Sequence, residues 1–201
     1  MHRRTLSLLA LLFLVSLPVF GSQFVELSFD QVASESQLIV RGTVVDTYSA
    51  WDDAHEVIYT YATLRVSRYF GETTGPDTLV VKEVGGTVDG YTMEAIGFPE
   101  IRQGEDVVLF LKAWDNSSDL RIHAYNQGKF LVRERGGRQL VVADSIHQGE
   151  SHAAREGNTP NAQVDAADDL GGALSIDELS HMIDDARAGK RAGSLPQLTR
   201  D

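Results

Sequence analysis

The chain has 201 residues, no cysteine and a formal net charge of −11. This length and the 42% hydrophobic content allow one domain with an ordinary core plus a tail. The lack of cysteine excludes disulfides, thiol catalysis and thiolate metal sites, and the acidity disfavours nucleic acid and anionic membrane surfaces as partners.

The first 21 residues have the three parts of a secretory signal. Two arginines precede an apolar stretch over 6–20, and small residues precede a cleavage point after Gly21. A membrane anchor is the alternative, but Ser16 and Pro18 interrupt a run that is already shorter than the roughly 18 residues a span requires. We therefore expect cleavage before Ser22, export to the periplasm or the exterior, and no stable membrane anchor afterwards.

A short helix and a first strand are expected at the start of the mature chain. Ser28 and Gln31 have the spacing of a capping box, which predicts a helix over roughly 28–36. The run LIVRGTVV over 38–45 then alternates with the two-residue period of a strand. Gly42 within this run indicates a bend or bulge, as small barrels require.

A second long strand follows a polar loop over 49–56. Its alternation places Ile58, Ala62, Leu64 and Val66 inward, whereas Tyr59 and Tyr61 face outward. Turn residues separate five further short strands, expected at 78–83, 106–113, 120–125, 129–133 and 139–143. Short strands at this spacing favour a closed barrel or a sandwich.

The last part of the chain changes in composition. Residues 147–172 contain almost no large apolar side chains, so we expect a flexible linker. Ser175 and Glu178 then form a second capping-box pattern, and Gly189 is a stop signal. The helix between them is expected to dock on the barrel, with a partner's groove as the alternative, through one apolar stripe: Ile176, Leu179, Met182, Ile183 and Ala186.

The order of a short helix, LIVRGTVV, a polar loop, VIYTYATLRVSRYFGE and a later GEDVVLFL resembles the OB-fold barrel of netrin-like domains and of the tissue inhibitors of metalloproteinases. It is also similar to uncharacterised exported bacterial proteins with segments like Gly85-Gly86, Gly97-Phe98-Pro99 and Gly104-Glu105. The resemblance spans roughly 27–132. It implies a small OB-fold-like barrel after a short helix. With the helix expected near the C-terminus, the fold class is mainly β: a small OB-fold-like barrel with a short N-terminal helix and a C-terminal amphipathic helix.

The signal pattern, the resemblance and the change in composition together divide the chain into a signal peptide over 1–21, a barrel domain over 22–146, a linker over 147–172 and a C-terminal helix and tail over 173–201. The resembled inhibitors bind a catalytic zinc through the amine and carbonyl of an N-terminal cysteine. This chain has Ser22 at that place and no disulfide to hold it. Its α-amine is partly neutral near pH 7 and could ligate zinc, and a mobile N-terminus is the alternative.

Signatures of an enzyme are missing from the sequence. The histidines form no HExxH pattern, and no serine lies in a G-x-S-x-G elbow. Gly85 and Gly86 fit turns or a close backbone approach better than a phosphate loop. The acidic pair Asp52-Asp53 lacks the spacing of a calcium loop. We therefore predict no catalytic residue, no metal site and no cofactor.

Recognition of a partner remains as a function. The candidate binding residues are Trp51, Tyr59, Tyr61, Phe98 and Ser22, because aromatic side chains on a barrel face supply apolar area with a polar end. Cross-strand packing is the alternative role of the tyrosines. We expect an exported, non-enzymatic protein-binding module, with inhibition of a secreted metalloprotease as its sharpest form. The alternative is a structural or assembly factor of the cell envelope that recruits a partner through the C-terminal helix.

Overall fold

The computed structural model describes residues 27–71, 73–114, 117–144 and 173–190. The expected signal over 1–21, Ser22 and the expected linker over 147–172 lie outside these ranges.

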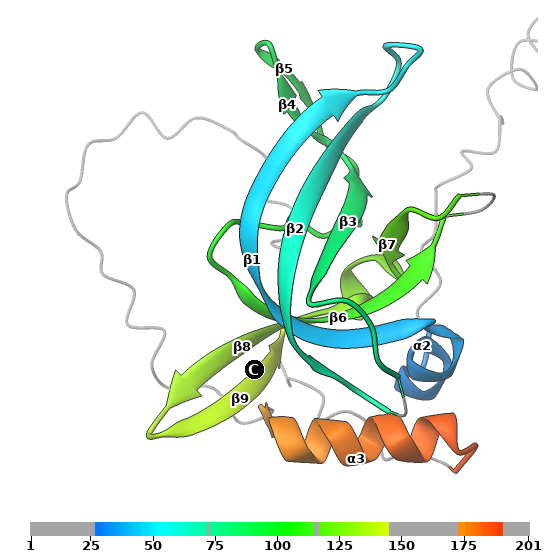
Figure 1. Ribbon diagram of the computed structural model, residues 1–201, viewed down its shortest axis with the longest axis vertical. Coiled ribbons are helices and arrows are strands. Elements are labelled where there is room, and N and C mark those ends of the chain that lie inside the picture. The colour runs from blue at the N-terminus through cyan, green and yellow to red at the C-terminus, as the bar shows by residue number, and fades with distance from the viewer. Residues whose placement is uncertain (1–26, 72, 115–116, 145–172, 191–201) are drawn as a thin grey trace, which may run out of the picture.

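Five strands close into a small mixed barrel (Figure 1). The strands are β1 (Leu38–Trp51), β2 (Ile58–Tyr69), β3 (Thr78–Val84), β6 (Asp106–Ala113) and β7 (Leu120–Ile122). β2 pairs antiparallel with both β1 and β3, β7 lies parallel to β3, and β6 pairs with β7 and β1 to complete the ring. This is the mainly β, OB-fold-like barrel that the sequence predicts.

The first two strands form a long bent hairpin. The pairing of β1 with β2 shifts its register at Gly42, where a bend was predicted, and again between Val44 and Asp46. A Cβ atom at Gly42 would lie 2.8 Å from Leu64 Cγ, so only glycine permits this approach of the two strands. β1 continues through Trp51, and the connecting loop is therefore shorter than the sequence suggested.

The sheet continues beyond the barrel. β8 (Lys129–Arg135) pairs with the first half of β6, and β9 (Arg138–Ala143) and β10 (Leu174–Ser175) follow at the edge. The predicted strand over 120–125 ends at Ile122 and gives way to the 3₁₀ helix η1 (Tyr125–Gly128). A separate hairpin, β4 (Gly86–Val88) with β5 (Tyr91–Met93), was not predicted.

Two hydrophobic clusters lie on opposite faces of β6, which is buried from Val107 to Leu111. Alternate residues of β6 belong to the two clusters, as the two-residue period of a strand requires. Val107, Leu109 and Leu111 fill the barrel. Val108 and Phe110 pack in the second cluster, between the sheet and the helices.

Two helices cover this second cluster. α2 (Phe29–Glu35) and α3 (Ile176–Arg187) lie beside one another below the barrel (Figure 1). Both begin with the predicted capping boxes, at Ser28 and Ser175. Leu179 and Ile183 are fully buried, so the apolar stripe of α3 docks on the protein's own sheet. Within the described ranges, no helix is both long and apolar enough to cross a membrane.

Candidate functional site

The predicted aromatic residues lie on two different faces of the β1–β2 hairpin. In the strand register Tyr48 is opposite Tyr61 and Ala50 is opposite Tyr59, which places these side chains on the outer face. Trp51 is one position further along β1 and therefore projects to the opposite, concave side. The structure thus brings Tyr59 and Tyr61 together and separates Trp51 from them.

The outer face carries a continuous row of aromatic and cationic side chains across the barrel strands. The rings of Tyr48 and Tyr61 are stacked, with centroids 4.9 Å apart, because the two residues are direct cross-strand partners. Tyr59 packs edge-on against Trp114 at 6.1 Å. We call the following residues the outer aromatic face: Tyr48, Tyr59, Tyr61, Lys82, Trp114 and Arg121.

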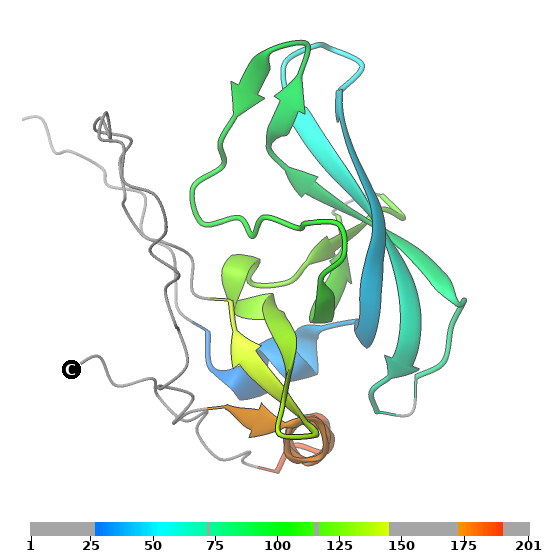
Figure 2. The same cartoon turned by 90° about the vertical axis from the view of Figure 1, so that its left-hand side faces the viewer.

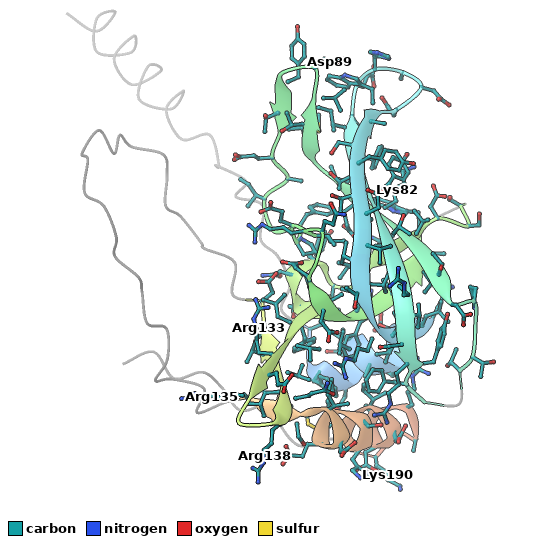
Figure 3. All side chains as sticks on the ribbon, turned by 60° about the vertical axis from the view of Figure 1, so that its left-hand side comes forward. Lys82, Asp89, Arg133, Arg135, Arg138 and Lys190 are labelled. Carbon is teal, nitrogen blue, oxygen red and sulfur yellow. The ribbon has the colours of Figure 1, made fainter. Side chains whose placement is uncertain are left out.

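Two cations connect the rings of this face. Lys82 Nζ lies 4.4 Å from the ring centre of Tyr59 and 5.6 Å from that of Tyr61, within the range of cation–π attraction. The Arg121 guanidinium lies 5.0 Å from the ring of Trp114. Figure 3 shows Lys82 well away from the arginines of the β8–β9 hairpin. The outer aromatic face therefore holds two cations, of which Lys82 is paired with Asp119.

Local hydrogen bonds hold Lys82 in place. Its ammonium group donates to Asp119 at 3.1 Å, and its main-chain carbonyl accepts a hydrogen bond from Trp114 Nε1, also at 3.1 Å. Burial alone would lower the pKa of Lys82, but the bond to Asp119 and the nearby Tyr61 hydroxyl raise it above its ordinary value. Lys82 thus stays charged.

Trp51 belongs to a second aromatic group, at the tips of two hairpins. Its ring stacks on His55 at 5.6 Å and meets Tyr91 of β5 edge-on at 6.0 Å. The turn after Trp51 is closed by Asp52 Oδ1, which accepts hydrogen bonds from the N–H groups of Glu56 and Val57. These bonds, the one from Val57 foremost, lower the pKa of Asp52.

The concave side of the hairpin holds a groove of about 500 Å³ at the mouth of the barrel. We call it the mouth groove. The β4–β5 hairpin forms one wall, and the segment over 94–101, which descends from β5 and crosses toward β6, forms another (Figure 2). A Cβ atom at Gly86 would collide with the hydroxyl groups of Ser49 and Thr60. Gly86 therefore permits the close backbone approach that the sequence suggested.

Glu83 lines this groove and is almost completely buried. Only 3% of Glu83 is exposed to solvent, and its carboxyl group accepts a hydrogen bond from the Ile122 N–H at 2.5 Å. Burial raises its pKa to about 8, although this hydrogen bond and the nearby Arg121 act in the opposite direction. Glu83 was not among the predicted site residues. The sequence did contain a sign of its burial: Glu83 follows Leu79 and Val81 at the two-residue spacing of the inner face of β3.

Phe98, a predicted site residue, lies in the wall of the mouth groove. Its ring packs edge-on against Tyr125 at 4.8 Å, and the neighbouring Gly97 carbonyl accepts a hydrogen bond from the Asn126 N–H at 3.2 Å. η1 thus supports this wall from behind.

A buried ammonium group fixes the end of the same wall. The Lys129 side chain is fully buried, and its Nζ lies 2.9 Å from Glu105 Oε2 and 2.8 Å from Asp144 Oδ2. Lys129 also donates a hydrogen bond to the main-chain carbonyl of Glu100. This ion cluster connects β8 with the segment between Phe98 and β6, and so positions the groove.

Replacing Lys129 with methionine is expected to lower the free energy of unfolding by about 1 to 3 kcal/mol, because the partly buried carboxylates of Glu105 and Asp144 lose the ammonium group that bridges them. Urea unfolding measures this loss. As a control, Lys190→Met removes an ammonium group whose side chain is 73% exposed and paired with Asp185 at the surface, and should cost less than about 1 kcal/mol. Equal effects of the two variants would contradict the role given to Lys129.

Among the residues that the structure describes, no group of three or more His, Asp or Glu side chains could hold a metal ion. Ser22, the candidate zinc ligand, lies outside the described residues.

No protein-family model matches the chain, and comparisons with curated proteins and with solved structures found no match. Of the resemblance to netrin-like domains, the structure supports the small five-stranded barrel alone.

Proposed function

We propose that this chain is an exported, non-enzymatic binding protein that holds a protein partner on its outer aromatic face. One observation carries this proposal: the rings of Tyr48, Tyr59, Tyr61 and Trp114 are already packed against one another and against two cations before any partner is present. Ordered aromatic side chains lose little further entropy on binding. Export rests on the signal-like residues 1–21.

The charge of this face indicates the kind of partner. Arg121 supplies positive charge in a chain whose net charge is −11, and Lys82 adds an ammonium group that is paired with Asp119. Tyr48 and Val80 are 55% and 49% exposed beside them. Aromatic residues and arginine are enriched at the centres of protein interfaces. The face therefore suits a protein segment with apolar side chains and flanking carboxylates.

Two finer proposals use other parts of the chain. Inhibition of a secreted metalloprotease would need Ser22 at the zinc, in addition to any contact with the barrel. Recruitment of an envelope partner by the C-terminal helix would have to use the exposed side of α3, which carries Asp177, His181 and Asp184. No observation favours either over the outer aromatic face.

The test compares partner capture by matched variants of the chain beginning at Ser22. Periplasmic and extracellular fractions are passed over the wild type, a Tyr48→Ala/Tyr61→Ala variant and a Tyr91→Ala variant. Tyr91 is 66% exposed at the tip of the β4–β5 hairpin, away from the outer aromatic face, and so controls for loss of an exposed tyrosine. Thermal unfolding confirms that each variant is folded.

Proteins bound by the wild type and by Tyr91→Ala but lost from the double variant would support the proposal. Their retention by a folded double variant would overturn it. Repeating the capture with a metal chelator tests the inhibitor form, since a protease held through its zinc would be released.

A further inference from the structure

The mouth groove has a polar floor that is only partly used by the protein itself. Glu83 forms this floor with the hydroxyl groups of Ser49 and Thr60, which lie 2.9 Å apart. Thr60 donates to the Gly85 carbonyl at 2.7 Å. Among the described residues, the Ile122 N–H is the only hydrogen-bond partner of the Glu83 carboxyl group, and it uses one of the two oxygens.

The ionisable side chains that line the groove are all acidic. They are Glu83, Glu94 and Glu100, the last of which is paired with Arg102 outside the groove, and no Lys, Arg or His lines it. The described carboxylates do not gather closely enough to hold a metal ion. A cation that needs only one carboxylate and a few neutral acceptors fits this arrangement better than a divalent metal.

The apolar part of the groove lies next to its polar floor. Phe98, Ile101, Val84 and Met93 are among its apolar lining residues. An alkyl chain that ends in a charged group matches this arrangement, because its methylene groups can contact the apolar lining residues while the charged group reaches the polar floor. A primary ammonium group has three donors, and Glu83, Ser49 and Thr60 supply acceptors.

We propose that the mouth groove binds a primary alkylammonium group, with its head on Glu83 and its methylene chain against Phe98. Two sources carry this chemistry: a lysine side chain of a peptide and a free diamine. The site lies on the concave side of the β1–β2 hairpin, so it does not depend on the outer aromatic face.

Binding should release a proton. The buried Glu83 carboxyl group holds its proton at neutral pH, and an ammonium head beside it favours the ionised form. Charged groups near Glu83 are Arg121 on β7 and the groove residues Glu94 and Glu100. Affinity of the wild type should therefore rise by up to about tenfold per pH unit between pH 6 and pH 8.

The test is isothermal titration of the folded chain with three probes: cadaverine, the peptide acetyl-Gly-Lys-Gly-amide and its norleucine counterpart, which lacks the ammonium head. Titration in two buffers of different ionisation enthalpy measures the proton release in the wild type, without any variant. Glu83→Gln should bind the cationic probes at least about tenfold more weakly and lose the pH dependence. Glu134→Gln, at an exposed carboxylate on β8 outside the groove, is the matched control, and should retain both properties.

Tight binding of cadaverine alone would assign the groove to free diamines, and binding of the lysine peptide would assign it to basic protein segments. Either result supports the proposal. Three results would overturn it: no binding of either cationic probe at roughly 10 mM, equal binding of the norleucine peptide, or unchanged affinity in folded Glu83→Gln.

Discussion

Replacing Glu83 with glutamine is expected to make the protein more stable at alkaline pH and to change its stability near pH 5 by less than about 1 kcal/mol. The folded-state pKa of Glu83 is raised to about 8 from an ordinary 4.5. The wild-type folded state therefore holds a proton that the unfolded chain gives up. This contribution is fully present below the ordinary pKa and is lost as the pH rises through about 8.

The size of the effect follows from the same values. The wild type should lose roughly 4 to 5 kcal/mol between pH 4.5 and pH 9 through this one group. Glutamine has nearly the shape of the protonated side chain, and its carbonyl oxygen can still accept the hydrogen bond from the Ile122 N–H. The difference between wild type and Glu83→Gln should therefore grow with pH across this window.

Urea unfolding at pH 5 and at pH 9 measures this difference. Glu94→Gln is the control, because Glu94 is an exposed carboxylate in the same groove and its replacement should leave the wild-type pH dependence intact. Parallel losses of stability in the wild type and Glu83→Gln would show that Glu83 is ionised in the folded protein.

The local features of this fold could be predicted from the sequence. Each capping box needs only a serine and a Gln or Glu three residues later, and both were found where they were expected. The strands around Gly42 and after Ile58 have long alternating runs, since one face of each fills the barrel. Such signals are contained within a few neighbouring residues.

The closure of the barrel had no local signal. β3 meets β7 through one parallel pair, Val81 with Leu120, and these residues are far apart in the chain. β4 and β5 have three residues each, too few for an alternating pattern. The mouth groove needs this hairpin as one wall, so the groove could not be predicted either.

The site residues could likewise be predicted only where a local sequence pattern places them. Outward-facing Tyr59 and Tyr61 followed from alternation and do form one surface. Trp51 was expected in a loop beside them, but β1 extends through it, and the strand period then places its side chain on the opposite face. Glu83 followed the inward alternation of β3, yet a carboxylate at the end of a strand ordinarily indicates exposure to solvent.

Replacing Leu179 with alanine is expected to lower the free energy of unfolding by about 2 to 5 kcal/mol, because it leaves a cavity under the sheet. Leu179 is fully buried against the cluster that contains Phe110 and Phe130. The exposed His181 is the control on the same helix, and His181→Ala should change stability by less than about 0.5 kcal/mol. Urea unfolding compares the two variants, and equal stability would mean that α3 is only loosely docked.

Because α3 is docked on the sheet, a test of whether it recruits a partner must leave this docking intact. Arg187 donates hydrogen bonds to Thr73 Oγ1 and to the Ser36 carbonyl, both at 3.1 Å, so the end of α3 is held by the loop after β2 and by the end of α2. Deleting 173–201 would remove these bonds, strand β10 and the cover of Phe110 together. Loss of a partner from the truncated chain would then report damage to the fold. Substitutions at the exposed His181 and Asp184 leave the docked side intact, and only their effect on partner binding bears on recruitment by this helix.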